Sequence, residues 1–163
     1  MDAELQSLSE SVGAACLPHR LLLSTAESCT GGWVAQVITH TAGSSSWFDR
    51  GFVTYSNDAK TDMLGVRPET LQQYGAVSQE TACEMAAGAM KNSKAMISLS
   101  ITGIAGPTGG SPGKPVGTVC FAWCRVGETA EAETAHFAGD REAVRRQAVV
   151  YALRGLQQRL DAA

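Results

Sequence analysis

Two groups of residues have the types and spacing that acyl-transfer chemistry needs. The first is "AESCTGG", residues 26–32, which places a serine, a cysteine, a threonine and two glycines after an apolar run. The second is Lys60, about one turn into an expected helix after "FVTYSN". A lysine shielded from water near the positive end of a helix loses its charge more readily, and its amine can act as a base toward serine. The ordinary alternative is a lysine on the surface.

Spacing alone does not choose the nucleophile that would pair with Lys60. Four serines offer a hydroxyl, namely Ser28 in the first motif and Ser44, Ser45 and Ser46 in the loop "GSSSWF". Cys29 is a rival, because a thiol at a helix N-terminus is acidified. Serine runs more often form turns and helix caps. The three histidines have no setting that indicates a serine–histidine–acid triad.

Two further features point to a bound phosphate. The loop "ITGIAGPTGGSPGKPVGT" is neither a Walker A loop nor a dinucleotide fingerprint, yet its glycines let backbone N–H groups approach a ligand closely. Arg141 and Arg145 are four residues apart, so they share one face of a helix that begins after Gly139 and Asp140. Guanidinium groups beside free helix N–H groups make a phosphate site. The alternatives are a mobile hairpin connection and a solvated basic face.

Length and composition predict one domain over residues 1–163, with a net charge of −3. The absence of a basic stripe argues against nucleic acid, and no apolar run approaches the ~20 residues of a membrane span. The polar, acidic start "MDAELQSLSE" argues against a secretory signal. Five cysteines without a CxxC pattern predict reduced thiols in a cytoplasmic protein, with Cys120 and Cys124 buried in a strand. No ligand spacing for a catalytic metal is present, so no metal is expected.

Helix and strand patterns are mixed along the whole chain. The expected strands are "RLLLST", "FDRGFVTYS", "AMISLSITGIAG", "VGTVCFAWCRV" and "ETAHFAG". The expected helix starts are a cap at Asn57, Pro68 in a first turn, and caps at Ser78 and Asp140. This pattern predicts an α/β fold with helices on both faces of a mixed sheet. Ligands bind beyond strand ends in such sheets, so "AESCTGG", "GSSSWF" and "TGIAGPTGG" are the expected site loops.

Six motifs in order carry a family resemblance: "AESCTGG", "AGSSSWFDRGFVTYSNDAK", "GAVS", "ITGIAGPTGG", "KPVGTV" and "GDREAVRRQA". Together they resemble the C-terminal domain of the competence-damage-inducible protein CinA, from about Leu5 to Leu160. Stand-alone versions of that domain are bacterial nicotinamide mononucleotide deamidases. The resemblance implies a three-layer α/β/α sandwich with a mixed, mostly parallel sheet. It also implies hydrolysis of the nicotinamide amide to nicotinate and ammonia, without a cofactor, by a protein that forms a homodimer.

The resemblance also assigns roles to residues of this chain. It places the catalytic serine–lysine pair on Ser45 and Lys60, and protonated Lys60 or Tyr55 is expected to give a proton to the leaving ammonia. The expected substrate-binding residues are Ser28, Thr30, Gly31, Gly32, Thr102, Gly103, Arg141 and Arg145, with the arginines on the phosphate. Cys29 is expected to be a packed neighbour. The alternative function is a regulatory module that binds a nucleotide without turnover and has no need of Lys60.

Overall fold

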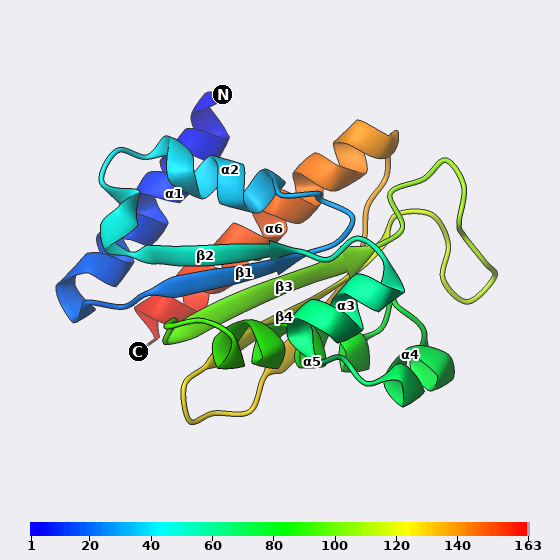
Figure 1. The fold of residues 1–163 in the computed structure, drawn as a ribbon. Helices are drawn as coiled ribbons and strands as arrows, with labels where there is room; N and C mark the ends of the chain where they lie inside the picture. The colour runs from blue at the N-terminus through cyan, green and yellow to red at the C-terminus, as the bar shows by residue number, and fades with distance from the viewer. Residues whose placement is uncertain (163) are drawn as a thin grey trace.

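The computed structural model describes residues 1–162 and shows a five-stranded sheet between two layers of helices (Figure 1). The strands are β1 (Leu23–Glu27), β2 (Phe48–Val53), β3 (Ile97–Gly103), β4 (Thr118–Arg125) and β5 (Glu131–His136). The α-helices are α1 (Ala3–Cys16), α2 (Trp33–His40), α3 (Asn57–Leu64), α4 (Pro68–Tyr74), α5 (Gln79–Lys91) and α6 (Arg141–Asp161). Two short 3₁₀ helices are η1 (Leu17–His19) and η2 (Ser44–Ser46).

The order of the strands across the sheet is β2-β1-β3-β4-β5. Strand β1 pairs in parallel with β2 and β3, whereas β4 is antiparallel to both of its neighbours, β3 and β5. Only β4 therefore runs against the others, which confirms the predicted mixed, mostly parallel sheet. The carboxyl ends of β1, β2 and β3 meet at one edge of the sheet, and the segment of residues 104–117 leaves β3 at that edge (Figure 1).

Helices cover both faces of the sheet, as predicted. Helices α1, α2 and α6 pack on one face, and α3, α4 and α5 lie on the other (Figure 1). The larger apolar cluster lies under α1, α2 and α6. Alanines of α5 pack with Cys120, Ala122 and Cys124 on the opposite face, so the two cysteines are buried as expected. Within residues 1–162, none of the helices has both the length and the apolar character that crossing a membrane needs.

Strand β3 shows how side-chain alternation serves both faces. Its residues Ile97, Leu99 and Ile101 belong to the larger apolar cluster. The three hydroxyl residues between them face the other way and donate to backbone carbonyls: Ser98 to Ala86 at 2.7 Å, Ser100 to Ala82 at 2.6 Å and Thr102 to Ala76 at 2.8 Å. These hydroxyl side chains are small, so α5 can pack close to the strand. Their hydrogen bonds offset the cost of burying polar groups.

The helix starts follow the predicted capping chemistry with one exception. Ser78 accepts a hydrogen bond from the N–H of Thr81, and Asp140 accepts one from the N–H of Ala143, as expected for N-caps. Pro68 is the first residue of α4, also as predicted. The predicted cap at Asn57 is wrong by one residue. The cap is Ser56, whose side chain accepts from the N–H of Ala59, because Ser56 has the extended backbone that a cap needs.

Gly88 lets α3 and α5 approach each other closely. A Cβ atom at this position would lie 2.0 Å from the carbonyl oxygen of Leu64 at the end of α3. That oxygen belongs to the backbone, so the clash can be relieved only if α3 and α5 move apart. Since α3 carries Lys60, the contact at Gly88 also affects how far Lys60 lies from the sheet.

We expect Gly88→Ala to lower the free energy of unfolding. Overpacking of this kind costs ~1–3 kcal/mol or more, against the ~1 kcal/mol that alanine gains in helix propensity. Urea denaturation measures the change. Gly113→Ala is the matched control, because a Cβ there meets no atom within 4 Å. Equal stability of the two variants would contradict the close approach of α3 and α5.

Candidate active site

A cavity of about 290 Å³ lies at the edge where the parallel strands end. Ser28 follows β1, Tyr55 follows β2, Gly103 ends β3, and Arg141 begins α6; all four line the cavity. Lys60 reaches it from α3. Because parallel strands bring their carboxyl ends together, loops distant in the chain meet here. "AESCTGG" and "TGIAGPTGG" both contribute to this cavity, as the sequence predicts.

Lys60 is the buried charge of the cavity, with only 1% of its surface exposed. Its Nζ lies 3.0 Å from the carbonyl oxygen of Thr54, 3.3 Å from that of Tyr55 and 3.1 Å from Oγ of Ser28. The ends of α3 fix its place, with the cap at Ser56 before it and a left-handed Gly65 after it. The side chain of Lys60 thus extends from a short, capped helix toward the edge of the sheet.

The surroundings of Lys60 favour its neutral form. Burial lowers the pKa of the Lys60 amine from its ordinary value of 10.5, and the nearby Cys29 opposes this to a lesser degree. A neutral amine has two N–H groups and one lone pair. In the structure Nζ donates to both carbonyls and to Oγ of Ser28. When the amine is neutral, the carbonyls of Thr54 and Tyr55 can keep its two N–H groups, and its lone pair then faces the hydroxyl of Ser28. This arrangement allows Lys60 to withdraw the proton of Ser28.

The structure does not bring Ser45 to Lys60. Ser45 is exposed in η2, which precedes β2, whereas Lys60 follows β2. The six residues of β2 span roughly 20 Å at about 3.3 Å each, so Ser45 lies at the opposite edge of the sheet. The hydrogen bond from the N–H of Leu23 to the carbonyl of Trp47 marks that edge as the start of β1. The structure therefore places Ser28 beside Lys60, and not the predicted Ser45.

Cys29 has the wrong electrostatics for a nucleophile. It is buried, and burial together with the charge of Glu27 raises the pKa of its thiol to about 12. A thiol with so high a pKa carries almost no thiolate near neutral pH. Cys29 lines the cavity as a packed neighbour, in line with the expectation.

The turn that carries Ser28 is ordered by its own hydrogen bonds. The N–H of Gly31 donates to the carbonyl of Ser28, and that of Trp33 to the carbonyl of Thr30. Gly31 and Gly32 have φ values of +60° and +100°, which explains the glycine pair. Neither glycine lines the cavity. Their observed role is to bend the chain from β1 into α2, whereas substrate binding was the expectation.

The two threonines expected to bind substrate are both buried. Thr30 is fully buried and donates its hydroxyl to Oε1 of Glu27 at 2.6 Å, so it faces away from the cavity. Thr102 lines the cavity but donates its hydroxyl to the carbonyl of Ala76. Gly103 lines the cavity beside it. Of these three, Thr102 and Gly103 form the wall next to Ser28, and Thr30 supports the turn from below.

Tyr55 and Arg141 form the mouth of the cavity. The Tyr55 side chain is 62% exposed, and its hydroxyl accepts a hydrogen bond from Nη2 of Arg141 at 3.1 Å. Nη1 of Arg141 donates to the carbonyl of Gly106 at 2.9 Å. Within residues 1–162, no hydrogen bond joins the Tyr55 hydroxyl to Ser28 or Lys60. The structure thus places the Tyr55 hydroxyl beside Arg141 in the same cavity as Ser28 and Lys60, and its role as a proton donor stays a prediction.

Arg145, expected to hold phosphate, is directed at the backbone of the protein. Its Nε donates to the carbonyl of Cys29 at 3.0 Å and its Nη2 to the carbonyl of Thr30 at 3.2 Å. The guanidinium also lies over the ring of Trp33, 5.4 Å from its centre. Arg145 is not among the residues that line the cavity. Of the two arginines that share this helix face, only Arg141 lines the cavity.

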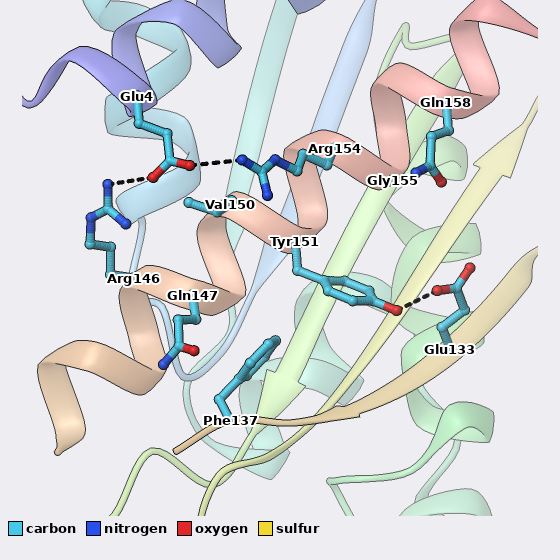
Figure 2. A pocket seen from close by; sticks show the side chains of 10 residues that line it. All are labelled: Glu4, Glu133, Phe137, Arg146, Gln147, Val150, Tyr151, Arg154, Gly155 and Gln158. Carbon is cyan, nitrogen blue, oxygen red and sulfur yellow. Dashed lines mark hydrogen bonds and ion pairs between the residues drawn. The ribbon is translucent and has the colours of Figure 1, made fainter. Parts of the chain in front are cut away.

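A second hollow, of about 510 Å³, lies against α6 and is also lined by Glu4 of α1 and Glu133 of β5 (Figure 2). Its charged groups are already paired with one another. Glu4 accepts from both Arg146 and Arg154, and the hydroxyl of Tyr151 donates to Glu133 (Figure 2). It contains no serine, cysteine or lysine. These pairs hold α1 and β5 to α6, so this hollow is not the candidate site.

Sequence reasoning left two features of the site undetected. It assigns no place in the site to Glu27, whose carboxylate is buried beneath the Ser28 turn, or to Asn57, which it expects only as a helix cap and which lines the cavity. It also weighed Ser28 and Ser45 equally until the resemblance favoured Ser45. One signal separates them: Ser28 follows a strand, as Lys60 does, whereas Ser45 precedes one.

The family comparison gives one model that matches, the CinA C-terminal domain, over residues 5–160. Among curated proteins, the chain is 58% identical over 157 residues to "Nicotinamide-nucleotide amidohydrolase PncC" of Escherichia coli strain K12, covering 96% of this chain and 95% of that protein. It is 54% identical to the protein of the same name from Pseudomonas putida, covering 83% and 84% of the two chains.

Longer proteins and solved structures are similar as well. A "CinA-like protein" of Kosmotoga olearia is 50% identical over 148 residues, which are 91% of this chain and 36% of that protein. Among crystal structures, the competence/damage inducible protein CihA from Agrobacterium tumefaciens superposes with a TM-score of 0.95 at 44% identity, covering 99% of this chain and 98% of that chain. These proteins share both the fold and nearly the whole length of this chain.

We expect a fluorophosphonate, which reacts with activated serines, to label Ser28 and to leave Ser45 unlabelled. The reason is that only Ser28 lies beside a buried amine. Intact-mass measurement followed by peptide mapping identifies the labelled residue. Ser28→Ala should lose the label, and Ser45→Ala, the matched control, should keep it. A label on Ser45 would restore the original assignment.

We expect the labelling rate to rise with pH and to level off above the lowered pKa of Lys60. Only the neutral amine can accept the proton, and burial brings its titration below pH 10.5. Lys60→Met should slow labelling by ~10²- to 10⁴-fold, the usual contribution of a general base. The exposed Lys91, changed to Met, serves as the control. A Lys60→Met variant that keeps the wild-type pH profile would exclude Lys60 as the base.

Proposed function

Since the chain belongs to the CinA C-terminal domain family, we propose that it is an amidohydrolase that converts nicotinamide mononucleotide to nicotinic acid mononucleotide and ammonia. The observation that carries the proposal is the buried Nζ of Lys60, 3.1 Å from Oγ of Ser28 in a cavity. The names of the relatives from Escherichia coli and Pseudomonas putida supply the substrate. The product can return to the synthesis of NAD, so the reaction recycles pyridine nucleotide.

The first half of the reaction forms an ester on Ser28. The neutral amine of Lys60 takes the hydroxyl proton while Oγ bonds to the amide carbon, and the carbonyl electron pair moves to oxygen. When the carbonyl re-forms, the C–N bond breaks and the ammonium of Lys60 returns its proton to the leaving nitrogen. Ammonia departs, and the nicotinoyl group remains on Ser28.

The second half repeats these steps with water. Lys60 is neutral again after ammonia has left, so it can take a proton from water that attacks the ester carbon. The bond to Oγ of Ser28 then breaks, and Lys60 returns the proton to that oxygen. One amide and one water are consumed, and one carboxylic acid and one ammonia are formed. No cofactor is needed for this balance.

The N–H of Cys29 is the proposed oxyanion donor, because Cys29 lines the cavity and Thr30 does not. Within residues 1–162, neither the N–H of Cys29 nor that of Thr30 donates to another group. The N–H of the residue after a nucleophilic serine commonly stabilises the oxyanion in serine hydrolases. Such preorganised donors contribute ~2.7–4 kcal/mol each to the barrier. Cys29 thus serves through its backbone, while its thiol remains inert.

Arg141 is the group proposed to bind the 5′-phosphate. Apart from Lys60, it is the sole cation among the described residues that line the cavity. Its guanidinium stands at the mouth, joined to Tyr55 and Gly106, so it can exchange these neutral partners for a phosphate. A charged acceptor makes the stronger hydrogen bond. Tyr55 then covers the entrance, and Ser28 lies deeper in the cavity, where the amide is to react.

Assembly and location follow from the same proposal. The proposal includes a homodimer, which the family resemblance implies. A cytoplasmic location agrees with five free cysteines, four of them buried, and a lack of affinity for nucleic acid agrees with the net charge of −3. Light scattering after size exclusion measures the oligomeric state. Fluorescence anisotropy with a labelled duplex measures nucleic-acid binding.

Release of ammonia from nicotinamide mononucleotide tests the proposed function. We expect the purified protein to release one ammonia per nicotinic acid mononucleotide, with EDTA present or absent. Ser28→Ala should lose the activity by ~10³-fold or more, because nucleophile and base act as a unit. Ser45→Ala should keep it. A wild-type protein that binds the mononucleotide without releasing ammonia would favour the regulatory alternative.

A further inference from the structure

Two charged side chains hold the turn that carries Ser28, and neither lines the cavity. Glu27 lies below the turn with 1% of its surface exposed, and Arg145 reaches it from α6. The sequence separation between them is large, so only the folded chain brings them to the same turn. Both are absent from the set of residues that face the cavity.

Glu27 holds the turn through three donors. Its Oε1 accepts from the hydroxyl of Thr30 at 2.6 Å and from the N–H of Val34 at 2.9 Å, while Oε2 accepts from the N–H of Ala35 at 3.1 Å. Among residues 1–162, no arginine or lysine forms an ion pair with it. The positive end of α2 serves as the counter-charge to the Glu27 carboxylate, because free helix N–H groups stabilise a carboxylate. The turn is thereby tied to the start of α2.

The main chain of Glu27 also reaches the other half of the catalytic pair. Its carbonyl accepts from the N–H of Thr54 at 2.8 Å, and the carbonyl of Thr54 in turn accepts from Nζ of Lys60 at 3.0 Å. Glu27 is therefore linked through the backbone to both Ser28 and Lys60. The distance between Oγ of Ser28 and Nζ of Lys60 decides whether the hydroxyl proton can be transferred. A shift of its backbone moves Ser28 directly and Lys60 through Thr54.

Arg145 holds the opposite side of the turn through two carbonyls. Its planar guanidinium donates to the oxygens of Cys29 and Thr30, and the stacking on Trp33 fixes its plane. In a trans peptide the N–H points opposite to the C=O. The carbonyl of Cys29 faces Arg145, so the N–H of Thr30 is turned away from Arg145. Arg145 thus sets the direction of a donor that no other described group uses.

We propose that Glu27 and Arg145 are positioning residues that fix the Ser28 turn for catalysis, and that Arg145 does not bind the substrate. The proposal rests on the proposed function, since it concerns the same reaction. The two side chains determine where Oγ of Ser28 stands relative to the reacting carbonyl. Changes to either should alter kcat, because substrate binding depends on other groups.

Arg145→Lys is the main test. A single ammonium cannot donate to two carbonyls in the planar geometry of a guanidinium. We expect kcat for nicotinamide mononucleotide to fall by ~10- to 100-fold, the cost of a small misplacement of reacting groups. KM should stay within about threefold, since no substrate contact is lost. A KM that rises more than kcat falls, or no change in either, would overturn the proposal.

Arg141→Lys is the matched control, one turn earlier on the same helix face. It makes the same chemical change at a residue that lines the cavity. We expect its main effect on KM, and a narrower preference for nicotinamide mononucleotide over nicotinamide riboside, which lacks the phosphate. In Arg145→Lys, by contrast, that preference should remain as in the wild type. A preference that narrows only in Arg145→Lys would show that Arg145 holds the phosphate.

Hydrogen exchange provides a readout that does not depend on turnover. In Arg145→Lys, the amides of residues 28–32 should exchange faster than in the wild type, and those of β4 should not change. If the wild type releases no ammonia, the proposed function fails, yet the exchange result still decides whether Arg145 holds the turn. Unchanged exchange in residues 28–32 would overturn the positioning role.

Glu27→Gln tests the other side of the turn. The amide can keep the acceptor for Thr30 and Val34, but it then places an NH₂ group against the N–H of Ala35. We expect the same fall in kcat with little change in KM, provided that thermal melting shows a folded variant. Normal kcat in a folded Glu27→Gln variant would remove Glu27 from the proposal, and a variant that does not fold leaves the decision to Arg145→Lys.

Discussion

The buried amine of Lys60 is the constraint on which the site depends. An amine taken out of water must find acceptors, and this one finds the carbonyls of Thr54 and Tyr55 and the hydroxyl of Ser28. The two carbonyls belong to the chain that leaves β2, and the hydroxyl to the chain that leaves β1. The lysine therefore joins two strand ends, and its lowered pKa results from the same burial that creates the cavity.

The packing of α3 and the chemistry of the site are coupled for this reason. Lys60 reaches the sheet edge only because α3 lies close to α5, with the carbonyl of Leu64 against Gly88. The hydroxyls of β3 let α5 lie close to the sheet in turn, and the last of them, Thr102, is also a wall of the cavity. The small side chains on this face thus allow the helices to pack closely, and that packing sets the position of Lys60.

The turn around Ser28 divides its polar groups between structure and reaction. The Thr30 hydroxyl and the carbonyls of Cys29 and Thr30 are bound by protein side chains, whereas the Ser28 hydroxyl faces Lys60 and two backbone N–H groups have no partner among residues 1–162. This division also explains the different environments of the two arginines on one helix face. Arg145 lies over the turn and is occupied by it, while Arg141 lies one turn nearer the helix start and reaches the cavity mouth.

The sequence by itself determined the fold class, the order of the elements, most of the caps and the importance of "AESCTGG" and Lys60. These properties depend on local periodicity, on turn chemistry and on motifs long enough to indicate a family. Only the tertiary structure decided which serine meets Lys60 and which arginine lines the cavity. Ser45 and Lys60 are close in sequence, but they lie at opposite ends of β2 and are separated by its length. Arg141 and Arg145 share one helix face, but that face extends over several turns. The parallel pairing of β1 with β2 and β3 brings Ser28 to the same edge as Lys60, and pairing between distant strands is not encoded in local spacing.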